Sequence, residues 1–175
     1  WDTDVAHFGI DIWMTTCAVN EGHTIVQTYL GTKIHGAKDP ASDLGPMFRQ
    51  VVSTVFYLMS KYEHNWHREN PFRAIQIKNK IDEEPKLEAI SVSMNDLHEE
   101  FVEGFQQFRP MYGDILNDDN LDRLDDIYNS WNSNKEAEFD AMLWSKILYD
   151  FAYIYQQWQR NKRRLVDIIT PLYFG

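Results

Sequence analysis

Residues 46–63 read PMFRQVVSTVFYLMSKYE and carry the clearest helical pattern in the chain. Apolar side chains recur at intervals of three or four residues from Leu44 to Tyr62, so they share one face of a helix. Pro46 suits the first turn, where its missing N–H group would have no helical partner in any case. This stretch predicts a helix over about 46–63 and makes a helix-rich fold the first expectation.

A shorter helix and a strand are expected upstream of this segment. Apolar residues spaced three or four apart predict a helix over about 9–21 that ends at Gly22. Residues 24–30 are rich in β-branched and aromatic side chains and predict a strand, whose pattern extends toward His35. Residues 36–40 then predict a loop.

The segment downstream of the central helix is less regular. Residues 64–71 are polar and end in a proline, which favours a boundary there. Residues 72–77 fit either a short strand or a helical turn, and the pattern does not decide between them. Residues 78–86 are highly charged and contain a proline, so they predict a solvated connection.

From Ser93 onward the sequence has helical periodicity and short joints, which predict an antiparallel helical bundle. Ser93 suits the N-cap of the first of these helices, and Pro110 closes it. The capping box Ser133-x-x-Glu136 opens the longest helix. Two further apolar segments complete the set, residues 121–131 and 165–169. The chain is therefore expected to be mainly α with one or two short β-strands.

Composition and charge restrict the classes of function. Hydrophobic residues make up 43% of the 175 residues and aromatic residues 14%, which argues for a folded core. The net charge of −10 opposes binding to nucleic acids and anionic membrane surfaces. No stretch approaches the roughly 20 apolar residues that span a bilayer. The lone cysteine, Cys17, fits a reducing compartment, so a cytoplasmic location is expected.

Three residues of the first forty are candidates for chemistry. Asp11 lies in the first turn of the expected helix, where a substrate hydroxyl could reach its carboxylate. His35 follows the expected strand, and an imidazole there could complete a divalent metal site together with carboxylates from elsewhere. Lys38, in the next loop, could neutralise a phosphate. Taken singly, each also fits a purely structural or surface role.

The order of these features is more specific than any of them alone. It comprises Phe8–Trp13, Gly22, the strand 25–30, Lys33–His35, Lys38–Pro40 and Leu44–Gln50. This order resembles the C-terminal half of the catalytic domain in nucleotide-sugar-dependent glycosyltransferases of the GT-A fold. The similarity is closest to the branch that contains mannosylglycerate synthase and glucosyl-3-phosphoglycerate synthase. It covers about residues 5–63, and the helical remainder only in general character.

The resemblance implies a reaction and a role for each candidate residue. Asp11 would be the catalytic, acceptor-binding carboxylate, and Lys38 would bind the donor phosphate. His35 would bind the divalent metal, Mg²⁺ or Mn²⁺, with an Asp-x-Asp motif expected upstream of the chain. The protein would transfer a sugar from a nucleotide-sugar donor to a small acceptor, with retention. Gly36 stands where the mannosylglycerate enzymes have a basic residue, which leaves the donor and the acceptor undefined.

The resemblance also implies a division of the chain. Residues 1–63 would be the C-terminal part of the catalytic domain, 64–92 a connection and 93–175 a helical C-terminal subdomain. Because the sequence starts at Trp1 and stops at Gly175 within structured patterns, we expect a fragment of a longer enzyme that is inactive by itself.

A second interpretation is a stand-alone helical protein–protein interaction module. The aromatic stripes on residues 94–109 and 136–159 motivate it, since an unpartnered stripe would offer a groove to another helix. In that case Asp11 and His35 would be incidental. Under either interpretation the sequence leaves open a homo-oligomer.

Overall fold

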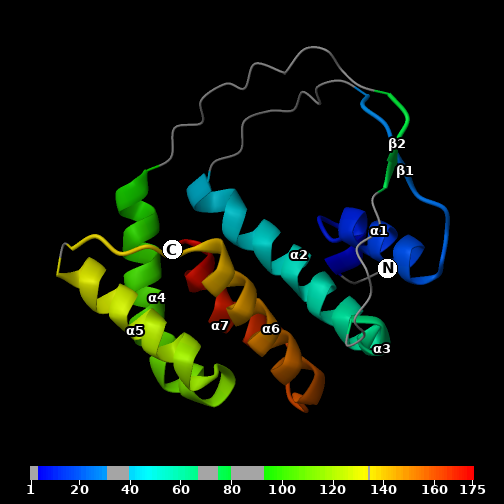
Figure 1. The fold of residues 1–175 in the computed structure, drawn as a ribbon. Coiled ribbons are helices and arrows are strands. Elements are labelled where there is room, and N and C mark those ends of the chain that lie inside the picture. Colours follow the sequence, from blue (N-terminus) through cyan, green and yellow to red (C-terminus); the bar gives the residue numbers. More distant parts are fainter. Residues whose placement is uncertain (1–3, 31–39, 67–74, 80–92, 134) are drawn as a thin grey trace. The chain divides into compact units, whose positions relative to one another are not determined.

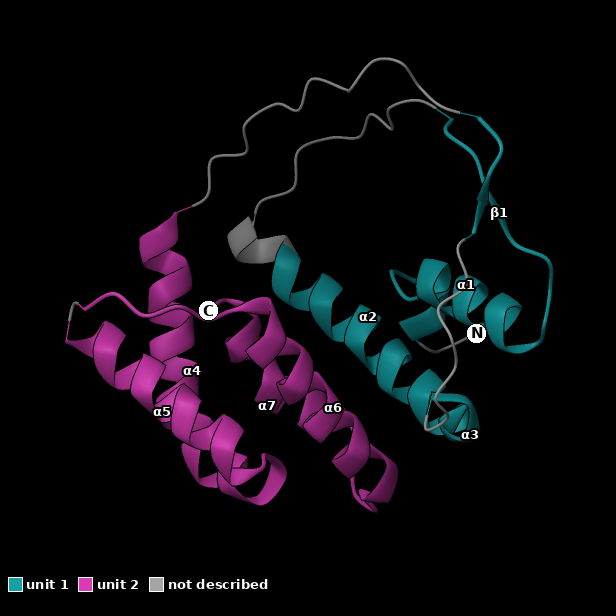
Figure 2. Cartoon of the chain, in the orientation of Figure 1, with its two compact units in different colours: residues 1–92 teal, residues 93–175 magenta. Residues whose placement is uncertain are grey.

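The computed structural model describes residues 4–30, 40–66, 75–79, 93–133 and 135–175, with the side chains of residues 40–43 excepted. It is mainly helical, with 74% helix and one two-stranded parallel sheet (Figure 1). The predicted fold class, mainly α with short β-strands, is confirmed. The chain divides into two compact units, residues 1–92 and 93–175 (Figure 2).

The first unit is built on two packed helices, α1 (Ile10–Asn20) and α2 (Pro40–Lys61). A 3-10 turn, η1 (Asp4–Ala6), contacts both of them, and a single helical turn, α3 (Glu63–Trp66), follows α2. The predicted end of the first helix is confirmed, because Gly22 adopts a φ of 76°, a left-handed conformation that side chains disfavour.

The helix α2 begins earlier than its pattern predicted. It starts at Pro40 rather than near Pro46, which is an internal residue of the helix. Pro40 occupies the first-turn position that the sequence analysis gave to Pro46, and its fixed φ suits a helix start. Because Pro46 has no N–H group, α2 lacks one helical hydrogen bond. The burial of Phe48 and Val52 just beyond it offsets the stability lost with that bond.

The core between α1 and α2 is a small apolar cluster. It consists of Cys17, Leu58 and Tyr62, with Ile12 and Trp13 packed against it. Cys17 and Leu58 are about 40 residues apart in the chain, so their burial in one cluster joins α1 to α2.

The two strands are short and form one parallel pair. The strand β1 (Val26–Gln27) lies beside β2 (Gln76–Ile77), with Val26 opposite Gln76. The Lys78 N–H extends the ladder by donating to the Gln27 carbonyl at 2.9 Å. The ambiguous segment 72–77 therefore ends in a strand, and the expected strand 24–30 is regular only at residues 26–27.

The second unit consists of four helices and a terminal 3-10 turn. The elements are α4 (Met94–Ile115), α5 (Asp118–Asn132), α6 (Ala141–Gln157), α7 (Arg163–Ile169) and η2 (Thr170–Tyr173). The helix α4 contacts all the others. Its Gly104 lies so close to η2 that an added Cβ would be 2.2 Å from the Cβ of Pro171, so only glycine fits there.

Two predicted helix ends in this unit are wrong. Pro110 lies inside α4, which runs on to Ile115 because Tyr112 and Ile115 beyond the proline are buried. The long helix does not open at Ser133, which instead caps the end of α5. Asp140 is the N-cap of α6, because its Oδ1 accepts from the Leu143 N–H at 2.7 Å.

Polar contacts tie the helices of the second unit together. The Arg109 guanidinium pairs with both carboxylate oxygens of Asp125, linking α4 to α5. The buried Asn120 amide donates to Oδ2 of Asp150 at 2.7 Å, linking α5 to α6. Among the helices that the structure describes, none combines the length and apolar character needed to cross a membrane.

Candidate functional site

The backbone just before α1 is fixed against α2. The Phe8 N–H donates to Oε1 of Gln50 at 3.2 Å, and the hydroxyl of the next-turn residue Thr54 donates to the Gln50 carbonyl at 2.9 Å. Gly9 lies so close to Thr54 that a Cβ at position 9 would be 2.1 Å from the threonine Oγ1. This close approach requires glycine and determines where α1 begins.

Asp11, the predicted catalytic residue, is the second residue of α1, and its side chain is exposed. It lies two residues after the Gly9–Thr54 contact, so the backbone that carries the carboxylate is held in place. A carboxylate in the first turn is favoured by the positive end of the helix dipole. The arrangement presents an acceptor for a ligand hydroxyl on a rigid element.

The chain leaves β1 through a side-chain clamp. The Tyr29 N–H donates to Oδ1 of Asn79 at 2.8 Å, and Nδ2 of Asn79 donates to the Tyr29 carbonyl at 3.0 Å. The Thr28 hydroxyl donates to the same Oδ1 at 2.6 Å. Because one amide satisfies both backbone groups of Tyr29, it acts like an additional strand residue. Asn79 thus fixes the direction of the chain shortly before residues 31–39.

The other two predicted site residues, His35 and Lys38, lie outside the described residues. The structure therefore describes one of the three candidates, Asp11, and the metal and phosphate roles stay predictions. In sequence, His35 follows the clamped Tyr29 by six residues and Lys38 by nine.

The described residues do not assemble a metal centre by themselves. Within the part of the chain that the structure covers, no group of three or more His, Cys, Asp or Glu side chains could hold a metal ion. The chain does contain one Asp-x-Asp spacing, at Asp2 and Asp4. Asp2 lies outside the described residues, and the backbone carbonyl of Asp4 accepts from the amides of His7 and Gly9.

The opposite end of α1 is also joined to α2, by a polar cluster around Tyr62. The Tyr62 hydroxyl donates to Oε1 of Glu21 at 3.0 Å. A hydrogen bond with the Cys17 thiol is the main cause that raises the pKa of Tyr62 above its ordinary value. Asn65 adds a hydrogen bond from its Nδ2 to Oδ1 of Asn20 at 2.8 Å. These contacts fix α1 at both ends and hold its first turn in place.

Sequence reasoning missed the residues that position this site. Asn79 belongs to a segment expected to be a solvated connection, and nothing in its local pattern indicates a partner 50 residues away. Gln50 and Thr54 are two of several polar residues of α2, so the sequence gives no signal that singles them out.

The chain was compared with known families, proteins and structures. No protein-family model, curated protein or solved structure matches the chain.

Proposed function

We propose that this chain is part of a metal-dependent glycosyltransferase that moves a sugar from a nucleotide-sugar donor to a small acceptor. The observation that carries the proposal is the fixed start of α1. There the contact between Gly9 and Thr54 holds the backbone that carries the exposed Asp11. The order of the segments supports it, because α1 and β1 lie in the described structure in the order that the resemblance implies, and His35 follows them in the sequence.

In this proposal Asp11 binds and orients the acceptor. Its carboxylate accepts a hydrogen bond from an acceptor hydroxyl and orients that oxygen toward the anomeric carbon of the donor. The bond from the anomeric carbon to the diphosphate breaks while the bond to the acceptor oxygen forms, and the proton of the acceptor hydroxyl passes to the departing diphosphate. A rigidly placed carboxylate contributes because orientation lowers the entropic part of the barrier.

The donor side is assigned to two residues that follow β1 in the sequence. His35 is proposed as one ligand of Mg²⁺ or Mn²⁺, and Lys38 as a positive charge for the donor phosphates. Such an ion stabilises the negative charge on the departing nucleoside diphosphate. The described residues supply no complete metal shell, and the proposal names one metal ligand in this chain, His35.

An assay of the protein encoded by the complete reading frame around residues 1–175 tests this function. Uridine- and guanosine-diphosphate sugars would be supplied with Mg²⁺ or Mn²⁺, and release of the nucleoside diphosphate would be measured with and without acceptor sugars or glycerate. Acceptor-dependent release that is lost on chelation is the expected result. Full activity in His35→Ala would remove that residue from the metal role, and no release with any donor would overturn the proposal.

The alternative function, a helical interaction module, was motivated by aromatic stripes of the second unit that are largely buried. The aromatic stripes of the second unit are occupied, because Phe101 and Phe105 of α4 are buried. Ile147 and Phe151 of α6 are buried as well, and α6 contacts α4, α5 and α7. These four residues of the two stripes therefore belong to the core of the unit and are not open to a partner helix.

A further inference from the structure

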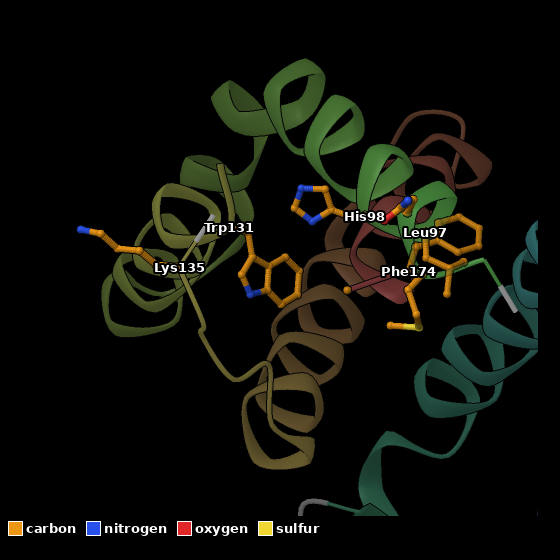
Figure 3. Close-up of a pocket in the computed structure, with 8 residues that line it drawn as sticks. Leu97, His98, Trp131, Lys135 and Phe174 are labelled. Atoms are coloured by element: carbon orange, nitrogen blue, oxygen red, sulfur yellow. The ribbon is translucent and has the colours of Figure 1, made fainter. Parts of the chain in front are cut away.

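The second unit contains a surface pocket of about 400 Å³ that the proposed reaction does not use (Figure 3). It lies where the start of α4, the end of α5 and the last residues of the chain meet. Its volume is within the usual range for small-molecule sites. We propose that this pocket binds a pyranose ring of a carbohydrate, either a free sugar or one unit of a glycan.

One wall of the pocket is apolar and rigid. Trp131 forms this wall, and Phe174, Leu97 and Met94 also line the pocket. The indole N–H of Trp131 donates to the Ala137 carbonyl at 3.0 Å, so its polar edge is already satisfied. The same ring packs edge-on against the fully buried Phe101, with centroids 4.9 Å apart. Trp131 is thus held in one orientation, which lowers the entropic cost of packing a ligand on it.

The polar groups of the pocket suit hydroxyl groups. Asn95 and His98 both line it from the first turns of α4, and both side chains are exposed. An amide and an imidazole can each donate and accept hydrogen bonds, as sugar hydroxyls do. Figure 3 shows His98 beside Trp131, whereas Lys135 extends away from them. A ring with an apolar C–H face and hydroxyls around its edge matches this combination.

The geometry disfavours a flat aromatic ligand. The rings of Trp131 and His98 have centroids 6.0 Å apart and planes inclined by 49°. A base sandwiched between two rings needs parallel planes about 7 Å apart, twice a contact distance of roughly 3.5 Å. The two rings therefore cannot enclose a nucleobase, but a sugar needs one aromatic face only.

The charged side chains of the pocket do not favour a cationic ligand. None of the described residues that line the pocket is acidic, although the whole chain carries a net charge of −10. Lys135 is among these residues, and its positive charge favours a neutral or acidic sugar over a cationic ligand. This inference does not rest on the proposed function, because the pocket lies in the second unit and Asp11 in the first.

Indole N–H resonances of the ¹⁵N-labelled chain provide the test. The peak that disappears in Trp131→Phe identifies Trp131, and maltotriose, cellotriose and mannotriose are then added to about 10 mM, where millimolar binding is visible. We expect at least one sugar to shift this peak. No shift with any of the three, or a shift with uridine monophosphate in their place, would overturn the assignment.

The Asn95→Ala/His98→Ala double variant tests the polar contacts. It removes two exposed side chains from a helix, so the fold is retained, and circular dichroism checks this. Loss of two hydrogen bonds predicts a Kd raised about tenfold. The matched control is Tyr153→Ala, an exposed residue of α6 outside the pocket, which leaves the Kd unchanged. A rise of threefold or more supports the proposal, and a smaller one contradicts it.

Discussion

The side-chain amide of Asn79 pairs with both backbone groups of Tyr29, which lies 50 residues earlier in the chain. The two hydrogen bonds, at 2.8 and 3.0 Å, continue the short ladder between β1 and β2 beyond its last backbone pair. A sheet of two residues per strand has little stability alone. The amide of Asn79 therefore accounts for much of the order at the exit of β1.

Replacement of Asn79 by alanine should loosen this exit. The Tyr29 N–H loses its acceptor, so its hydrogen exchange should accelerate about tenfold or more, as expected for loss of one such bond. Exchange measured by NMR checks this. The control is Asn132→Ala at the end of α5, which removes an exposed amide elsewhere. Unchanged exchange at Tyr29 in Asn79→Ala would show that the clamp does not hold the strand.

Replacement of Gly9 by alanine should destabilise the protein. The new Cβ would be 2.1 Å from the Thr54 Oγ1 and 2.8 Å from the Asp4 carbonyl oxygen, so the start of α1 must shift. Overpacking of this kind costs about 1–3 kcal/mol in the free energy of unfolding. Urea denaturation measures the change.

A matched glycine serves as the control for that experiment. Gly113 lies inside α4, and the nearest atom to an added Cβ is 4.0 Å away, so Gly113→Ala should stabilise by about 0.5–1 kcal/mol. Adding Thr54→Ala to Gly9→Ala should recover part of the lost stability, because it removes the closest atom. Equal stability of Gly9→Ala and the natural chain would contradict the close contact.

Removal of the Tyr112 hydroxyl should weaken the second unit. This hydroxyl is buried and donates to the Ile168 carbonyl at 2.9 Å, joining α4 to α7. Tyr112→Phe leaves that carbonyl without its partner, which costs about 1–3 kcal/mol. Tyr153→Phe, at an exposed tyrosine of α6, should change the free energy of unfolding by less than about 0.5 kcal/mol. Comparable effects of the two substitutions would exclude this role for Tyr112.

The same residue predicts an alkaline effect on stability. Burial raises the pKa of Tyr112 well above its ordinary value of 10.0. The folded state therefore retains the phenolic proton more strongly than the unfolded state. The contribution of Tyr112 to the free energy of unfolding is complete below pH 10 and declines as the pH rises above it. The urea midpoint of the natural chain should fall more steeply between pH 9 and about 11 than that of Tyr112→Phe. Parallel pH profiles would contradict this assignment.

The sequence was sufficient for the elements whose signals are local. The glycine at Gly22 ends α1 as its position predicts, and the N-cap at Ser93 opens α4, where its hydroxyl accepts from the Asp96 N–H. Periodicity also predicted that Phe101, Phe105 and Phe151 belong to apolar helix faces, and all three are buried.

Features that depend on distant partners could not be predicted in the same way. Pro110 normally closes a helix, but the burial of Tyr112 against α7 carries α4 past it. Ser133-x-x-Glu136 has the spacing of a capping box, yet Asp140 caps α6, where it also accepts from Arg123 at 2.8 Å. Both outcomes depend on contacts between helices.

In the candidate site, too, local features were predictable and distant contacts were not. The position of Asp11 in the first turn of a helix follows from its local pattern, and the structure agrees. The supporting contacts of Gln50, Thr54 and Asn79 join segments about 40–50 residues apart, so no local pattern reveals them.

The most direct measurement of the central claim compares sugar transfer by Asp11→Asn and Asp119→Asn. Asp119 is the exposed second residue of α5, so its substitution removes the same charge from an equivalent helix position in the other unit. If Asp11 orients the acceptor, Asp11→Asn should lower kcat/KM for the acceptor about 100-fold or more, while Asp119→Asn retains the natural rate. Equal rates for the two variants would contradict the account.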